Sequence, residues 1–292
     1  MIEIKEIEQI LDYYKNRIKQ NKFKLILIYI KDYYRKFKNY IFSILRFFQR
    51  TQEFTKVRYN RIWNKTDLKI FYDPENTNNC SIHSYKDSFF LSSNALSTRI
   101  HQYLVINKIN ELKPNSVLEV GCGQGFQLLL LSRLYPEINF FGIDQSDEGI
   151  MFAKKFAQKK IIEEELTKPL KYNFNNSETQ NINYSIQDAK KLEFESNSID
   201  LIFTNLALEQ MDNIKFEVLS EIKRVSSKYI VLIEPFKDLN NSGIKYLHHS
   251  SKQYFNLKYN ELVDENYAIV DYQKNFPSQI SLNYGLLVLK KL

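Results

Sequence analysis

The sequence predicts an α/β fold built around a mostly parallel sheet. Two apolar runs of strand length, at residues 117–120 and 138–143, flank a glycine cluster and an apolar run of helical length at residues 126–135. A strand, a glycine turn, a helix and a second strand form a βαβ unit, and such units build parallel sheets. The second strand ends on one acid, Asp144. This arrangement indicates a nucleoside-binding site.

The spacing of the glycines narrows the class of ligand. Glycines between residues 121 and 125 allow the backbone to approach a ligand closely. A dinucleotide fingerprint would need a further glycine where Phe126 stands. Glu119 lies just before the glycines, where a carboxylate disfavours a phosphorylated ligand. A tight turn without a ligand is the alternative interpretation, and the acid at the end of the next strand disfavours it.

The N-terminal part of the chain is basic, whereas the remainder is slightly acidic. Residues 1–70 contain 17 Lys and Arg and 7 Asp and Glu, a net charge of +10. The other 222 residues contain 24 and 27, a net charge of −3. Such asymmetry indicates that the N-terminal part meets a partner.

A basic amphipathic helix is expected between residues 22 and 50, after a short polar helix at residues 2–20. Apolar and aromatic side chains from Ile30 to Phe48 recur at helical spacing, and most Lys and Arg fall on the other face. Packing on the core or on a second subunit is one interpretation. Contact with the inner membrane surface is another. Nucleic-acid binding is less favoured, because no RNA-binding signature is present.

A loop rich in Pro and Asn at residues 73–79 indicates a domain boundary. It separates an α-helical N-terminal extension, residues 1–72, from a domain at residues 73–292. The core of that domain is expected at residues 115–292.

A cap helix is predicted at about residues 92–112, before the core. Ser92 or Ser93 is expected to be its N-cap, and Pro114 stops it. Beyond the βαβ unit, Ser146 is expected to cap a helix that runs to residue 160. An inserted polar loop at residues 161–181, strands at residues 183–186, 199–204, 229–233, 268–272 and 286–289, a helix at residues 213–226 and a loop at residues 238–251 complete the prediction.

The composition favours a reducing compartment. Only two cysteines occur, and they form no disulfide framework. The N-terminus lacks the basic start and apolar middle of a secretory signal. No apolar stretch approaches the ~18 residues needed to cross a membrane. We therefore expect a cytoplasmic protein, with peripheral contact at the inner membrane surface as an open alternative.

Four segments carry a family resemblance. VLEVGCGQG and FFGIDQS, within residues 117–146, resemble the first two motifs of class I S-adenosylmethionine-dependent methyltransferases. Residues 187–189 (QDA) and 198–209 (SIDLIFTNLALE) are similar to the third and fourth motifs of the branch that includes ubiquinone and small-molecule methyltransferases. Residues 221–235 resemble the segment that closes that core. The resemblance covers the chain from about residue 91 onward and implies a Rossmann-like seven-stranded sheet whose last strand is antiparallel.

The resemblance also implies S-adenosylmethionine as the cofactor. Asp144 would accept the ribose hydroxyls, Asp188 would meet the adenine amino group, and Glu119 would steady the glycine loop or the methionine amino group. The implied cofactor-binding residues are Glu119, Gly121, Cys122, Gly123, Gly125, Asp144, Gln145, Asp188, Ala189, Asn205 and Leu206.

A general base is harder to assign. Many members of the resembled branch carry a histidine where Gln210 stands, which leaves Glu209 beside it as a candidate. His248 is expected in a loop near the substrate mouth, and histidine has a suitable pKa. Glu209 and His248 are therefore the candidate catalytic residues. The cysteines and histidines show no ligand spacing, so no metal site is predicted.

The function expected from the resemblance is methyl transfer to a small-molecule acceptor, with lipid-linked and saccharide molecules among the candidates. Two alternatives stay open: an RNA or protein methyltransferase that uses the basic extension for recognition, and a non-catalytic member of the fold that binds the cofactor or a partner. The segment after Asn205 reads Leu-Ala-Leu. It lacks the Pro-Pro-Tyr or Pro-Pro-Phe of enzymes that methylate DNA adenine or glutamine, so that branch is disfavoured.

Overall fold

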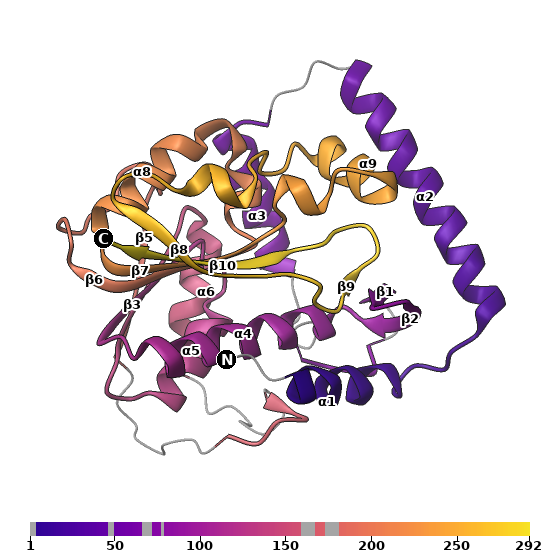
Figure 1. The fold of residues 1–292 in the computed structure, drawn as a ribbon, viewed down its shortest axis with the longest axis horizontal. Coiled ribbons are helices and arrows are strands. Elements are labelled where there is room, and N and C mark those ends of the chain that lie inside the picture. The colour runs from indigo at the N-terminus through magenta and orange to yellow at the C-terminus, as the bar shows by residue number, and fades with distance from the viewer. Residues whose placement is uncertain (1–3, 46–49, 66–71, 77–78, 159–166, 173–180) are drawn as a thin grey trace.

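The computed structural model describes residues 4–45, 50–65, 72–76, 79–158, 167–172 and 181–292. A seven-stranded sheet forms its centre, in the order β5-β4-β3-β6-β7-β10-β8 (Figure 1). The strands are β3 Ser116–Val120, β4 Asn139–Asp144, β5 Ile182–Ile186, β6 Ile199–Asn205, β7 Ser226–Glu234, β8 Tyr267–Gln273 and β10 Gly285–Lys291. The last strand, β10, runs antiparallel to both of its neighbours. The predicted α/β fold and its mostly parallel sheet are confirmed.

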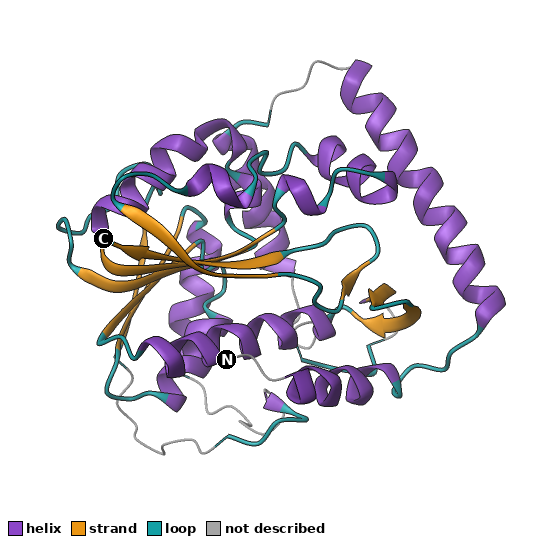
Figure 2. Cartoon of the chain, in the orientation of Figure 1, coloured by secondary structure: helices purple, strands orange, loops and turns teal. Residues whose placement is uncertain are grey.

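Helices cover both faces of this sheet (Figure 2). Alternate strand residues point to opposite faces, so Val117 joins the core beneath α4 and α5, whereas Leu118 joins the core beneath α8. The helices of the domain are α4 Ala95–Leu112, α5 Phe126–Leu134, α6 Asp147–Ala157, α8 Lys215–Val225 and α9 Gly243–Lys252, with short 3-10 helices η3 Leu208–Gln210, η4 Asp212–Ile214, η5 Lys237–Leu239 and η6 Tyr259–Leu262.

Among the described residues, three helices precede the predicted boundary, and they lie on different parts of the domain. They are α1 Ile4–Lys15, α2 Lys22–Leu45 and α3 Gln52–Lys65. Helix α1 packs on α4, α2 packs along α9, and α3 packs on α6. Ile10 and Tyr14 of α1 are fully buried in the main core. The division at residue 72 remains a prediction, but the hydrophobic core continues across it.

The sequence did not reveal a small second sheet. Its strands are β1 Cys80–Tyr85, β2 Ser88–Ser93 and the short β9 Ser278–Gln279. β1 pairs with β2 as a hairpin and with β9 from the far end of the chain. One of the two strand pairings of this sheet joins residues nearly 200 positions apart, which no local pattern can show.

Two local predictions are wrong, and one is confirmed. The segment at residues 238–251, expected as a loop, contains α9, because Ile244 and Leu247 bury one helical face. The N-cap of α4 is Asn94 rather than a serine, and its side chain makes no capping bond. The Ser146 cap of α6 is confirmed: its hydroxyl accepts a hydrogen bond from the Gly149 N–H at 3.0 Å. Most of the loop predicted at residues 161–181 falls outside the described residues.

If α1 is part of the core, truncating its buried face must destabilise the whole domain. Replacing a buried isoleucine with alanine costs about 2–5 kcal/mol. We expect Ile10→Ala to lower the free energy of unfolding by that amount in urea denaturation. Ile4→Ala is the matched control, because Ile4 lies on the same helix and is 62% exposed. Equal effects of the two variants would show that α1 does not belong to the core.

Candidate functional site

The site lies at the carboxyl edge of the sheet, where the chain leaves β3 through the glycine turn. The N–H groups of Gly121 and Cys122 both donate to the Ile143 carbonyl of β4, at 2.8 and 2.9 Å. Gly121 has φ +82°, and a Cβ there would lie 2.5 Å from the Ala207 Cβ. The turn therefore needs glycine both for its backbone angle and for the close approach of the loop that follows β6.

Asp144 ends β4 and holds the glycine turn. Its Oδ2 accepts from the Gly123 N–H at 2.9 Å and its Oδ1 from the Ser146 N–H at 2.7 Å. Burial raises the pKa of this carboxyl, and these backbone donors partly offset the rise. Each carboxylate oxygen has two lone pairs, so both can also accept hydroxyl donors from a ligand.

Glu119 lies one strand away and is 4% exposed. Burial, and secondarily the negative charge of Asp144, raise its pKa to about 8. This carboxyl is therefore mostly protonated at neutral pH. Its Oε2 atom has no hydrogen-bond partner in the described part of the chain. A cationic ligand group beside it would stabilise the charged form and lower that pKa.

The loop after β6 forms a second wall. Leu206 takes φ +53°, a left-handed conformation that is uncommon for a leucine and clusters at functional sites. Glu234, at the end of β7, stabilises the loop. Its carboxylate accepts from the N–H groups of Ala207 and Leu208, each at 3.0 Å, and of Glu209 at 3.1 Å. These bonds hold the loop in position against the cavity.

Glu209 projects from this loop and is also buried. Burial, and then the nearby Glu234, raise its pKa to about 8. Its Oε1 accepts from the Gln210 amide, and the Gln210 oxygen accepts from the Arg50 guanidinium. A chain of hydrogen bonds thus joins the carboxyl to the segment before α3. The Oε2 atom has no partner among the described residues.

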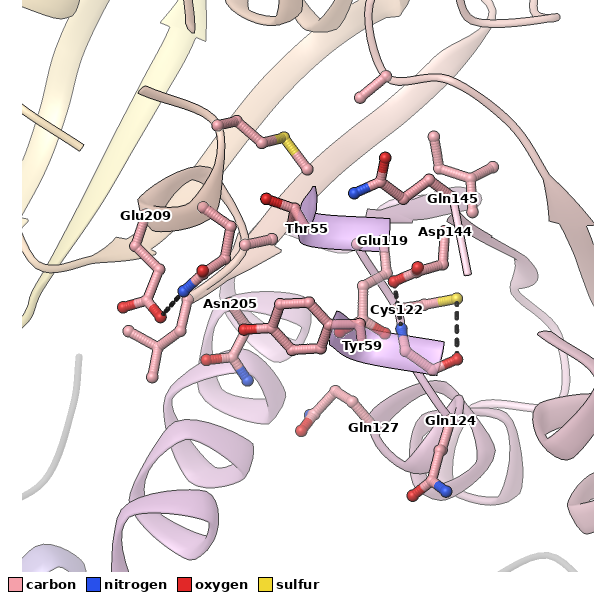
Figure 3. Close-up of a pocket in the computed structure, with 18 of the residues that line it drawn as sticks. Thr55, Tyr59, Glu119, Cys122, Gln124, Gln127, Asp144, Gln145, Asn205 and Glu209 are labelled. Atoms are coloured by element: carbon pink, nitrogen blue, oxygen red, sulfur yellow. Dashed lines mark hydrogen bonds between the residues drawn. The ribbon is translucent and has the colours of Figure 1, made fainter. Parts of the chain in front are cut away.

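Helix α3 covers the site. Its Lys56 pairs with Asp147 of α6 at 2.9 Å, and Asn60 accepts from the Ser146 hydroxyl at 2.6 Å. The Trp63 ring lies so close to the glycine turn that a Cβ at Gly123 would be 2.9 Å from it. Figure 3 shows the Tyr59 ring between the side of the site that holds Glu119 and Asp144 and the side that holds Glu209.

These elements enclose a cavity of about 360 Å³. Its inner surface carries side chains that each have a buried nitrogen or oxygen without a partner in the described part of the chain. They include Glu119, Gln124, Gln127 and Glu209. An unpaired buried polar atom costs about 1–3 kcal/mol. A polar ligand that satisfies several of them fits this cavity better than an apolar ligand would.

Ten of the eleven predicted cofactor residues line the cavity together. The exception is Gly125, which begins α5 and whose carbonyl accepts from the Tyr184 hydroxyl at 3.0 Å. Asp188 lies at the rim, with its side chain 59% exposed and 3.4 Å from the Lys190 ammonium. The structure therefore brings the predicted residues to one place, although their roles remain predictions.

The two candidate catalytic residues separate. Glu209 lines the cavity, whereas His248 does not. His248 lies on α9, where its Nδ1 atom is 2.8 Å from the Lys36 ammonium of α2. Burial and nearby cations lower its pKa. This position joins α9 to α2 and disfavours the predicted role as a base. His101 of α4 lines the cavity instead.

The wall formed by α3 was missed. Gln52, Thr55, Tyr59 and Trp63 line the cavity, although the sequence resemblance begins far downstream of them. The one available signal was Trp63, the only tryptophan, in an otherwise basic segment.

Comparison with known proteins identifies the family and the fold. A family model described as "Methyltransferase domain" matches residues 112–267. A search of curated proteins returned no match.

None of the helices in the described part of the chain has the length and the apolar composition of a membrane-spanning segment.

Several solved structures share the fold at low sequence identity. A geranyl diphosphate methyltransferase in complex with GPP and sinefungin aligns with a TM-score of 0.56 and 11% identity, over 81% of this chain and 98% of that one. Geranyl diphosphate C-methyltransferase from Streptomyces coelicolor aligns with a TM-score of 0.51 and 11% identity, over the same shares. The cyclase SpnF aligns with a TM-score of 0.54 and 15% identity, over 82% and 96%.

The buried carboxyls predict how stability depends on pH. The pKa values of Glu119 and Glu209 are raised to about 8, and that of Glu234 to about 7. Unfolded glutamates titrate near ~4.3, so above that value the unfolded state binds fewer protons than the native state. Stability must then fall as pH rises, until about pH 8. Buried histidines, whose pKa values are lowered, make stability rise with pH, but only below pH ~6.5, the pKa of an unfolded histidine.

We therefore expect the free energy of unfolding of Glu119→Gln, relative to that of the wild type, to increase by about 1–2 kcal/mol between pH 6.5 and 8.5. The reason is that the variant has no carboxyl at this position to lose its proton. Urea denaturation of the ligand-free protein at several pH values measures this. Glu195→Gln, at an exposed position, is the control. Parallel pH curves for Glu119→Gln and the wild type would contradict the assignment.

Proposed function

The chain belongs to the methyltransferase domain family, and from that premise we propose that it transfers the methyl group of S-adenosylmethionine to a small-molecule acceptor. The observation that carries the proposal is the pair of strand-end acids, Glu119 and Asp144, on either side of the glycine turn in one cavity. Two structural neighbours were solved in complex with S-adenosylhomocysteine or sinefungin, and both are named for methyl transfer.

The residues fit such a cofactor by charge and hydrogen bonding. The cofactor supplies an electrophilic methyl group on a sulfonium, so the protein need not activate it. Asp144 would accept the two ribose hydroxyls. Glu119 would bind the amino group of the methionine part, giving up its proton as the positive charge approaches. Asp188 and the Ala189 backbone would meet the adenine at the rim. Tyr59 presents an aromatic face on which a cation is favoured.

The part of the cavity away from these residues is left for the acceptor. Thr98, His101, Gln210 and Met211 also line the cavity, and α3 forms one wall of it. Glu209 is the candidate to receive a proton from the acceptor: its pKa of about 8 lies near the operating range for acid–base catalysis, and its ionised form is the base. A covered cavity of about 360 Å³ favours a small molecule, or one extended group of a lipid-linked molecule, over a folded macromolecule.

Fold alone does not fix the reaction, as the similarity to a cyclase illustrates. An acceptor with an apolar part suits Phe126, Met211 and Ile214 in the cavity wall better than a saccharide does. Two neighbours named for geranyl diphosphate methylation agree with that class of acceptor.

Removing the ribose-binding acid should weaken cofactor binding. Hydrogen bonds to a charged group contribute about 1.5–3 kcal/mol each, so we expect Asp144→Ala to raise the Kd for S-adenosylhomocysteine by roughly tens-fold or more. Isothermal titration calorimetry measures this. Asp87→Ala, in the exposed turn between β1 and β2, should bind as the wild type does. An unchanged Kd for Asp144→Ala would refute the assignment.

The class of acceptor follows from where the methyl group goes. The protein is incubated with methyl-labelled S-adenosylmethionine and a cell extract, which is then separated into organic-soluble, water-soluble, protein and RNA fractions. We expect label in a small-molecule fraction, reduced by Glu209→Gln. Label confined to protein or RNA would show that the acceptor is a macromolecule. Binding without any transfer would favour a non-catalytic member of the fold.

A further inference from the structure

Helix α2 has an inverted surface. On a surface helix the apolar face normally packs inward and the polar face meets water. Here the inward face carries Asp32 and the buried Lys36 beside Leu25 and Ile28, while the outward face is almost wholly apolar. Its outward apolar side chains are between 39% and 71% exposed: Phe23, Ile26, Leu27, Ile30, Tyr33, Tyr34, Phe37, Ile41, Ile44 and Leu45.

The helix is nevertheless fixed on the domain. Leu25 and Ile28 pack against a buried cluster that includes Ile244 of α9. Lys36 bonds His248, and the Tyr40 ring lies 5.7 Å from that of Tyr246. Because these contacts hold the opposite side, the apolar face must point away from the protein. Figure 1 shows α2 along one edge of the molecule, apart from the central sheet.

Cations border this apolar face along one side. With about 3.6 residues per turn, Lys24, Lys31, Arg35 and Lys38 fall in one row beside the apolar residues. The only acid of α2 is Asp32, and it pairs with Arg35. An apolar stripe with a row of Lys and Arg beside it is the pattern of helices that lie in the interface of an anionic membrane.

Positively charged side chains also lie beside α2, on α3 and α9. A hollow of about 690 Å³ between α2, α3 and α9 carries four cationic side chains. They are Lys38, Arg50, Arg58 and Lys252. None of them forms an ion pair with a carboxylate in the described part of the chain. Anionic head groups would supply the missing negative charge.

We propose that the outward face of α2 docks this protein on a membrane surface that contains anionic phospholipid, with the apolar side chains among the acyl chains and the basic row at the head groups. A second copy of the chain fits less well, because it would bring two strongly basic N-terminal regions together. Nucleic acid would leave the aliphatic side chains in water. The proposal goes beyond the proposed function and does not depend on it.

Vesicle flotation of the full chain tests this. The probes are vesicles of phosphatidylcholine alone and of phosphatidylcholine with phosphatidylserine. We expect binding to the anionic vesicles that weakens as salt is raised. Ile30→Gln/Phe37→Gln should weaken it roughly tenfold or more, because each change removes apolar area from the lipid contact. Lys31→Glu/Lys38→Glu should have a similar effect, through charge.

Matched controls separate this surface from general stickiness. Phe216→Gln/Val270→Gln changes apolar residues that are 67% and 51% exposed elsewhere, and Lys154→Glu/Lys274→Glu changes distant exposed lysines. Both should bind as the wild type does, and all variants should keep its thermal midpoint. The proposal is overturned by absent vesicle binding, or by equal binding of the α2 variants. It also fails if light scattering shows a dimer that only the α2 variants break, or if the chain binds polyuridylate RNA but not vesicles.

Discussion

The buried carboxyl groups at the carboxyl edge of the sheet are the constraint on which the site depends. Glu119, Glu209 and Glu234 are each at most 7% exposed, and burial raises the pKa of all three. Removing a carboxylate from water is expensive unless it is paired or protonated. Glu234 recovers part of that cost through three backbone donors, whereas Glu119 and Glu209 each keep an oxygen without a partner among the described residues. Buried oxygens of this kind are tolerated where a bound ligand donates hydrogen bonds to them.

The N-terminal helices serve the site and the surface in different ways. Helix α1 fills the core, α3 closes the cavity and α2 lies outermost, so one continuous segment runs from the interior to the edge of the molecule (Figure 1). The hydrogen-bond chain from Arg50 through Gln210 to Glu209 connects the segment between α2 and α3 to an acid that lines the cavity. The protein thus combines a cofactor-binding domain with a basic N-terminal segment that covers the cavity through α3 and exposes an apolar surface on α2.

How far the sequence could predict this structure depended on whether a feature was local. Glu119 and Asp144 belong to one βαβ unit, which is contained within 30 consecutive residues and can be recognised from them. The resemblance to known motifs added Asp188 and Asn205 to the same predicted site. Tyr59 and Trp63 reach the cavity only because α3 docks on α6, a contact between segments about 90 residues apart that no local period records. The role predicted for His248 is disfavoured for a related reason. That prediction assumed a loop, but these residues form α9, where His248 contacts Lys36 of α2.

The central claim is that Glu119 and Asp144 together bind S-adenosylmethionine, with Glu119 exchanging a proton for the positive charge of the ligand. Calorimetric titration of S-adenosylhomocysteine at pH 7, in two buffers of different ionisation enthalpy, counts the protons released on binding. The account predicts that the wild type releases close to one proton per ligand, and that Glu119→Gln binds more weakly with almost none. Tight binding with no proton release in either protein would contradict it.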